Sequence, residues 1–138
     1  MSRTEWSRQG YRGYIASRPI CGSRTPQHVQ NLVVRDYANR HDLPFILSAT
    51  EFVMPGCYVV LEGVLQELES LSGIILYSLF MLPDDAMHRL AIYDRVLRSD
   101  ANLLTAVEDY RISSEADVSR VEEVWQISDT LKQCPKVI

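Results

Sequence analysis

The sequence predicts an α/β protein, a three-layer sandwich built around a mainly parallel sheet of four strands. Strand-like apolar runs alternate with helical apolar stripes four times along the chain. The strand-like runs are apolar throughout, which is typical of a sheet covered on both faces. Parallel strands need right-handed crossovers, and the intervening helices supply them. A length of 138 residues is that of one domain, so we expect a polar tail over residues 1–11 and a single α/β domain over residues 12–138.

The first strand–helix unit begins with a short apolar strand at residues 12–17, which leads into a loop rich in Pro and Gly at residues 18–24. Thr25 and Pro26 then predict a helix start, with Thr as the N-cap and Pro at the first helical position. The apolar stripe of this helix is expected at Val29, Leu32, Val33 and Tyr37.

The second and third units repeat this pattern. A strand at residues 45–48 precedes a helix whose apolar stripe is Leu61, Val64, Leu65 and Leu68. A third strand at residues 73–77 precedes a helix that begins at residues 83–85, where two acids complement the helix dipole. We expect the inner face of this third helix to carry Met87, Leu90, Ala91 and Leu97.

The fourth unit is a strand at residues 103–107 and a last helix, which Ser114 caps with Asp117 as its capping-box partner. The apolar positions of this helix include Val118, Val121, Val124, Trp125 and Ile127. That is more apolar surface than one side of a small sheet needs, so we expect a homodimer that meets through this helix. The alternative is that the helix only packs on its own sheet.

Composition excludes several classes of protein. No apolar run reaches the roughly 18 residues of a spanning helix, so no membrane partner is expected. The polar N-terminal residues lack the apolar stretch of a secretory signal. Three widely spaced cysteines make neither a disulfide framework nor a zinc pattern, which predicts reduced thiols in a cytoplasmic protein.

Charge is unevenly distributed. The net charge is −4, yet residues 1–42 hold seven Arg and only three acids. An acidic chain without a long basic face argues against nucleic-acid binding. Arg presents a planar fork that suits phosphate and carboxylate, so we expect a small anionic ligand in the N-terminal part.

The ligand is expected beyond the carboxyl ends of the strands, where open parallel sheets bind their ligands. The backbone N–H groups at the start of the first helix favour an anion there. Arg18 and Arg24 add charge-assisted contacts, with a phosphate as the expected group. The predicted ligand-binding residues are Arg18, Ser23, Arg24, Thr25, Thr50, Tyr77 and Ser78.

Three residues at the same edge are candidates for catalysis. Ser17 is a candidate nucleophile, and Glu51 and Glu108 are candidates for a general acid or base. No His lies beside Ser17 to activate it, and His41 is expected to serve as a dipole partner at a helix end. No metal-ligand spacing and no glycine-rich cofactor motif is present, so neither a metal nor a cofactor is predicted.

Short motifs spread over residues 12–112 carry a first family resemblance. They are Gly13-Tyr14-Ile15-Ala16-Ser17-Arg18, Pro26-Gln27 with Gln30-Asn31, Leu47-Ser48-Ala49-Thr50-Glu51, Tyr77-Ser78-Leu79-Phe80-Met81-Leu82-Pro83 and Ala106-Val107-Glu108. The chain thereby resembles the sporadic carbohydrate cluster proteins, a family named for its occurrence in bacterial clusters for surface-carbohydrate synthesis. The resemblance implies a role in that synthesis and assigns no catalytic residue.

The order and spacing of the elements also resemble, more distantly, the catalytic domain of serine recombinases, and imply a resolvase-like or flavodoxin-like fold. That family has Tyr-x-Arg-x-Ser at its first strand. Aligned on Tyr14, its Arg position is Ala16 and its nucleophile position is Arg18, while Ser17 points to the other side of the strand. Its later Asp-Arg-Leu-x-Arg aligns with residues 80–84, which hold no Arg. DNA strand exchange is therefore not expected.

The functional prediction is a cytoplasmic protein of surface-polysaccharide biosynthesis that binds or transforms a sugar phosphate or nucleotide sugar. It would be an enzyme or the partner subunit of one, and the sequence leaves this open. The alternative is a non-catalytic scaffold or binding module on a recombinase-like fold, which the absence of an assembled nucleophile–base pair supports.

Overall fold

A five-stranded sheet organises the protein in a computed structural model that describes residues 10–17, 20, 24–51 and 58–133. The strand order is β2-β1-β3-β4-β5. The first four strands run parallel and the fifth runs antiparallel to the fourth. Their bounds are β1 Tyr11–Ala16, β2 Phe45–Glu51, β3 Gly73–Leu76, β4 Asn102–Thr105 and β5 Tyr110–Ile112. The α/β fold with a mainly parallel sheet is therefore confirmed.

The sequence predicted four strands and missed the fifth, β5. After β4 the chain turns back at Asp109, whose φ of 59° lies in the left-handed region. The Tyr110 N–H then donates to Thr105 Oγ1 at 3.0 Å, which fixes the return of the chain. A three-residue strand is too short to show an apolar period, so Tyr110 was expected in a loop.

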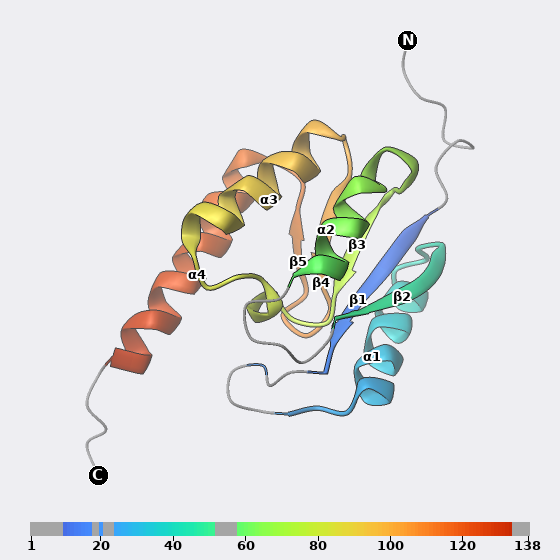
Figure 1. The fold of residues 1–138 in the computed structure, drawn as a ribbon, viewed down its shortest axis with the longest axis horizontal. Helices are drawn as coiled ribbons and strands as arrows, with labels where there is room; N and C mark the ends of the chain where they lie inside the picture. The colour runs from blue at the N-terminus through green and yellow to red at the C-terminus, as the bar shows by residue number, and fades with distance from the viewer. Residues whose placement is uncertain (1–9, 18–19, 21–23, 52–57, 134–138) are drawn as a thin grey trace.

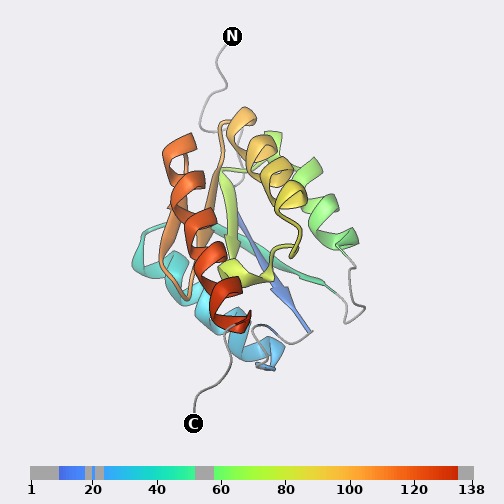
Figure 2. The ribbon, with the colours of Figure 1, turned by 90° about the vertical axis from the view of Figure 1, so that its left-hand side faces the viewer.

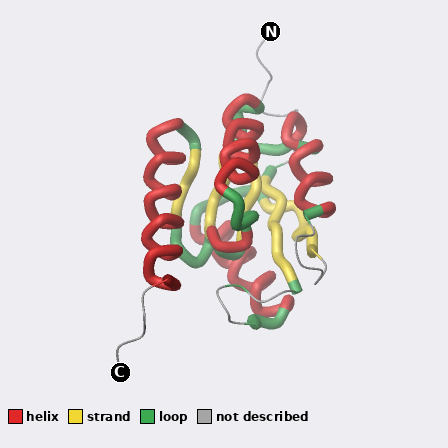
Figure 3. Tube along the Cα trace, turned by 60° about the vertical axis from the view of Figure 1, so that its left-hand side comes forward, coloured by secondary structure: helices red, strands yellow, loops and turns green. Residues whose placement is uncertain are grey.

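Helices cover the two faces of the sheet unequally. Helix α1 (Gln27–Arg40) lies on one face, while α2 (Val59–Gln66), α3 (Ala86–Arg98) and α4 (Glu115–Gln133) lie on the other (Figure 1 and Figure 2). Figure 3 shows the strands in yellow between these helical layers. Two short 3₁₀ turns, η2 (Leu68–Ser70) and η3 (Leu79–Met81), precede and follow β3. No helix of the described part has both the length and the apolar character that crossing a bilayer requires.

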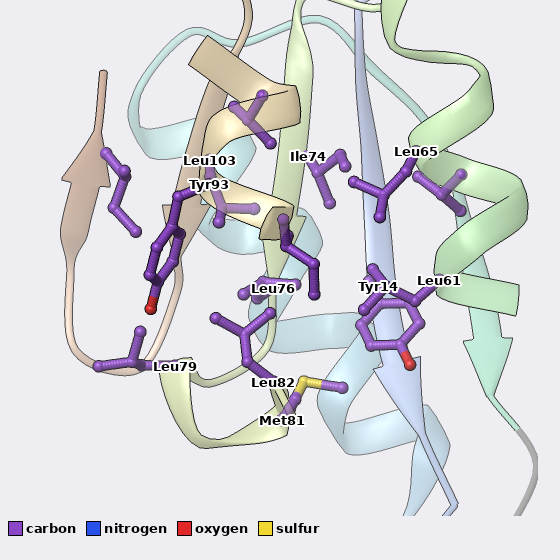
Figure 4. Packing of buried hydrophobic residues seen from close by; sticks show 14 of the residues in the cluster. Tyr14, Leu61, Leu65, Ile74, Leu76, Leu79, Met81, Leu82, Tyr93 and Leu103 are labelled. Atoms are coloured by element: carbon purple, nitrogen blue, oxygen red, sulfur yellow. The ribbon is translucent and has the colours of Figure 1, made fainter. Parts of the chain in front are cut away.

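The hydrophobic core has two parts, one on each face of the sheet. The larger part lies under α2, α3 and α4, where Tyr14, Ile74, Leu76 and Leu103 of the strands meet Leu61 and Tyr93 of the helices (Figure 4). The smaller part lies under α1 and includes Ile15, Val34, Tyr37, Ile75 and Leu104. Gly13 lets α1 approach β1, because a Cβ there would lie 2.9 Å from Val34 Cγ1 and 2.6 Å from Ser48 Oγ.

The predicted inner face of α3 was wrong at three of its four positions, whereas Leu97 is partly buried and packs against the core. Leu61, Val64, Leu65 and Leu68 are buried as expected, but in α3 Met87 is 74% exposed, Leu90 is 43% exposed and Ala91 is exposed. The face that packs inward carries Arg89, Ile92, Tyr93 and Val96. The sequence pattern predicted that a charged residue such as Arg89 would be exposed to solvent. In the structure its guanidinium is buried against the carboxylate of Glu122 in α4.

The other helices depart from the prediction at single positions. Leu32 of α1 is 64% exposed and Ile127 of α4 is 61% exposed, whereas Val118, Val121 and Trp125 of α4 are buried as expected. The capping of α4 by Ser114 is confirmed, because the Asp117 N–H donates to Ser114 Oγ, whereas the backbone N–H that donates to the Asp117 carboxylate is that of Ser113 and not of Ser114. Helix α1 begins one residue later than expected and has no side-chain cap.

Candidate functional site

The direction in which the chain crosses the sheet changes at β1. From β1 the chain passes through α1 to β2 on one side of β1, and β3 lies on the other side of β1. Open parallel sheets bind ligands at such a point, beyond the carboxyl ends of the strands. Ser17 ends β1 there, and its N–H and Oγ both donate to the carbonyl oxygen of Glu51, at 3.2 and 3.3 Å. The hydroxyl of Ser17 is thus turned toward β2 and faces a carbonyl group.

The carboxylate of Glu51 is fully buried and holds the start of α2. Its Oε1 accepts hydrogen bonds from the Tyr14 hydroxyl at 2.7 Å and from the Leu61 N–H at 3.0 Å. Its Oε2 accepts from the Val60 N–H at 3.1 Å. A carboxylate at this place satisfies free N–H groups of the first helical turn and complements the helix dipole. This geometry gives Glu51 a structural role, and its predicted catalytic role stays a prediction.

Glu108 and Ser78 form a second structural cluster. Ser78 Oγ donates to Glu108 Oε2 at 2.7 Å, and the Leu79 N–H donates to Glu108 Oε1 at 2.9 Å. Ser78 Oγ also accepts from the Phe80 N–H at 3.2 Å. These bonds fix η3 against the chain that follows β4. Ser78 is buried, whereas Glu108 is half-buried.

Gln30 is a residue that the sequence reasoning did not assign. Its side chain is fully buried. Its Oε1 accepts from the Ala16 N–H at 3.0 Å, and its Nε2 donates to the carbonyl oxygens of Ala16 at 2.7 Å and of Thr25 at 2.8 Å. One amide thereby ties α1 to the end of β1. The available signal was its helical spacing, since Gln30, Val34 and Tyr37 share one face.

The other predicted ligand-binding residues are scattered. Arg18 and Ser23 lie outside the described residues, as do the three cysteines. Arg24 is exposed and Thr25 is half-buried, both just before α1. Tyr77 is half-buried and packs between the two parts of the core. Thr50 lines a groove that the sequence did not predict.

This α1–β2 groove has a volume of about 640 Å³ and runs between α1 and the outermost strand. Its lining consists of Gln27, His28, Asn31 and Arg35 from α1, Phe45, Leu47, Ser48 and Thr50 from β2, and Ile15 from β1. The ionisable side chains among these, His28 and Arg35, are both bases. Ser48 Oγ donates to Asn31 Oδ1 at 2.6 Å, which connects the two walls. The guanidinium of Arg35 lies 6.0 Å from the ring centre of Phe45, and no carboxylate of the described residues pairs with it.

A separate cluster joins the end of α1 to the turn between β4 and β5. The ring of His41 stacks on Tyr37 with 4.2 Å between centroids, and His41 Nε2 lies 3.7 Å from Asp109 Oδ1. Burial, and then the hydrogen bond with Asp109, raise the pKa of Tyr37 to about 12. Because His41 is the C-terminal cap of α1, this cluster agrees with the structural role predicted for it.

The described residues assemble polar binding groups but no nucleophile with a base in contact. The oxygen that Ser17 Oγ reaches is a backbone carbonyl, and no His is hydrogen-bonded to it in the described part. The described chain also holds no group of three or more His, Cys, Asp or Glu that could bind a metal ion.

Comparison with known proteins identifies the fold alone. No family model and no curated protein matches the chain, so the resemblance to sporadic carbohydrate cluster proteins is not supported. A resolvase family site-specific recombinase from Streptococcus pneumoniae has a TM-score of 0.64 at 13% identity, over 89% of this chain and 91% of that one. The N-terminal catalytic domain of TP901-1 integrase has a TM-score of 0.64 at 14% identity, over 88% of this chain and 96% of that one. The resolvase-like fold predicted from the order of the elements is therefore confirmed.

Proposed function

We propose that this protein is a binding domain for a sugar phosphate or nucleotide sugar, with the α1–β2 groove as its site. The observation that carries this proposal is the lining of the groove, in which both ionisable side chains are bases and no carboxylate is present. A phosphate is the group that such a lining favours, because charge-assisted hydrogen bonds to it are stronger than neutral ones. A cytoplasmic role in surface-polysaccharide synthesis is part of this proposal and rests on the short sequence motifs of residues 12–112 alone.

The phosphate is expected near the start of α1. Gln27 and His28 of the first helical turn line the groove there. The turn contains no acidic residue, and no side chain caps it. Its N–H groups and the helix dipole therefore add to the attraction of the bases for an anion. Arg24, which the sequence assigned to the phosphate, is exposed just before this turn.

The sugar is expected against β2. Asn31, Ser48 and Thr50 offer hydrogen-bond donors and acceptors for hydroxyl groups. Phe45 and Leu47 offer apolar surface to the C–H face of the ring. A mixed lining with a few placed polar groups is typical of small-molecule sites. The volume of the groove, about 640 Å³, is also within the range of such sites.

A binding domain fits the described residues better than an enzyme. Glu51 and Glu108 are held by backbone N–H groups, and the hydroxyl of Ser17 donates to a carbonyl oxygen. The predicted alternative of a non-catalytic module is thus the form of the function that we favour. An enzyme whose catalytic groups belong to a partner subunit would use the same groove.

The recombinase-like fold suggests a second candidate function, DNA strand exchange. The described residues support it less well than ligand binding. The first of the two solved structures is described as a site-specific recombinase. In this chain the position of the family's strand-one Arg is Ala16, which is fully buried in the core. Without that Arg and those of the later motif, the contacts to a scissile phosphate are missing.

Replacing Arg35 with Ala is expected to weaken binding of the sugar phosphate about tenfold, because one charge-assisted contact contributes roughly 1.5 kcal/mol or more. A panel of sugar phosphates and nucleotide sugars is first screened by thermal shift, since a ligand of the folded state raises the midpoint. Titration calorimetry with the best compound then compares Arg35→Ala with the unaltered protein.

Arg98→Ala is the matched control, because Arg98 is an exposed residue of α3 that pairs with Asp94 outside the groove. Binding should be unchanged in this variant. A compound that binds with equal affinity to the unaltered protein and to Arg35→Ala would place its site elsewhere. A panel without any binder would overturn the proposed function.

A further inference from the structure

We propose that a second copy of this chain docks on the outer edge of β2, so that the two sheets join across a two-fold axis. This contact differs from the dimer through the last helix that the sequence predicted. It also does not depend on the proposed ligand.

The outer edge of β2 has backbone groups that only another extended chain can pair in register. Because the Ser17 N–H donates to the carbonyl oxygen of Glu51, the backbone of Glu51 faces β1. Backbone direction alternates along a parallel strand, so the N–H and C=O groups of Thr50 and Ser48 face away from β1. No strand of the described part lies beyond β2.

This edge has few of the devices that usually prevent strand addition, apart from one irregularity in its pairing between Phe45 and Ser48. Proteins protect edges with charged side chains, proline, bulges or very short strands. Residues 45–50 contain no charge and no proline, and β2 with seven residues is the longest strand of the sheet. The single irregularity in its pairing lies before Ser48. Leu47 at its middle is 66% exposed.

Charge and shape favour a second copy as the occupant. A hollow of about 540 Å³ adjoins the α1–β2 groove, and Leu32, Arg35, Asp36, Phe45 and Ile46 are part of its lining. Two copies related by a two-fold axis on β2 bring their α1 helices together antiparallel. Arg35 and Asp36 are adjacent on α1, and the pair that Asp36 forms with Arg40 of its own helix is exposed. Such a contact therefore sets Arg35 of one copy opposite Asp36 of the other, which favours association.

Apolar burial adds to this complementarity. Leu32 is 64% exposed beside the same hollow, and Leu47 is 66% exposed on the strand. An isologous contact covers the two leucines of both copies at once.

Leu47→Lys is expected to convert a dimer into a monomer, because it sets two like charges close to the axis and places a lysine on the edge. Light scattering after gel filtration is measured over about 10 to 200 µM, since dimerisation depends on concentration. The unaltered protein should show twice its chain mass of 15.8 kDa. In Leu47→Lys the dissociation constant should rise at least about tenfold.

Met87→Lys is the matched control, because Met87 is 74% exposed on α3 on the other face of the sheet. It should remain a dimer, and circular dichroism should show that all variants are folded. Hydrogen exchange localises the contact, since the amides of Ser48 and Thr50 should exchange more slowly in the dimer than in Leu47→Lys. A monomer mass for the unaltered protein at about 200 µM overturns the proposal. A dimer that survives Leu47→Lys but is lost in Ile127→Lys also overturns it, and places the contact on α4.

Discussion

Arg89→Ala is expected to lower the free energy of unfolding by about 3–5 kcal/mol, the usual cost of leaving one charge of a buried pair without its partner. Arg89 Nε and Nη2 donate to the two oxygens of Glu122 at 2.8 and 2.9 Å. The side chain of Arg89 is 3% exposed and that of Glu122 is 16% exposed. The substitution therefore leaves a carboxylate with little access to water.

The same guanidinium has further partners that alanine removes. Its Nη1 donates to the carbonyl oxygens of Pro83 at 3.0 Å and of Asp84 at 2.7 Å. Its Cζ lies 4.0 Å from the ring centre of Trp125 in a cation–π contact. Arg89 thus connects α3 to α4 and to the turn before α3.

Urea unfolding followed by circular dichroism measures this change as a shift of the midpoint at constant slope. Arg98→Ala is again the control, because an exposed pair with Asp94 contributes little. A loss below about 1 kcal/mol in Arg89→Ala would show that water reaches Glu122 and that the pair does not stabilise the fold.

Acid is expected to weaken the same contact. Burial raises the pKa of Glu122, but the hydrogen bonds from Arg89 and Tyr93 outweigh it and hold that pKa below its ordinary value. A carboxylate with a lower pKa in the folded than in the unfolded chain stabilises the fold at neutral pH. That stabilisation is lost as the pH falls through the folded pKa. Unfolding measured from neutral pH into the acid range should show a smaller acid-dependent loss in Glu122→Gln.

Glu51→Ala should cost about 2–4 kcal/mol, because the carboxylate accepts one hydroxyl and two backbone N–H groups in a fully buried place. The loss should appear as a lower thermal midpoint and as faster exchange of the Leu61 amide at the start of α2. Glu62→Ala is the matched control, since Glu62 also lies on α2 and forms a half-exposed pair with Arg95 of α3.

This substitution also separates the two roles that Glu51 has been given. A structural carboxylate predicts that Glu51→Ala loses stability and that Tyr14→Phe, which removes one of its donors, loses a smaller part. A catalytic carboxylate predicts full stability in Glu51→Ala together with loss of any activity. The second result would contradict the role that the hydrogen bonds indicate.

The architecture was predictable because its signals are local and repeated. Each of the four parallel strands contains a short apolar run, and the stripe predicted for the second helix is buried at every position. The inner face of α3 was not predictable, because a buried Arg89 is stable only with Glu122, thirty-three residues later in the chain. Single-residue patterns carry no information about such a partner.

Of the residues that line the α1–β2 groove, only Thr50 had been selected from the sequence. The rule for parallel sheets led to the carboxyl ends of the strands, and of the residues that it selected Thr50 lines the groove. His28, Asn31 and Arg35 were missed, because they lie on the outer side of α1, where polar residues are ordinarily solvated. Their importance follows from the position of β2 at the edge of the sheet, and strand order is not encoded in any local pattern.

The central position of β1 has a consequence for the synthesis of the protein. Its pairing with β3 joins Tyr11 to Gly73, roughly sixty residues later, and long-range parallel pairing forms slowly. Until Gly73 has left the ribosome, a growing chain holds β1 with one unpaired side, next to an apolar face that α3 and α4 cover only later. Partly made chains of this kind are prone to aggregate. A nascent chain stalled before residue 73 is therefore expected to need a chaperone. In the finished protein the same apolar surface is buried.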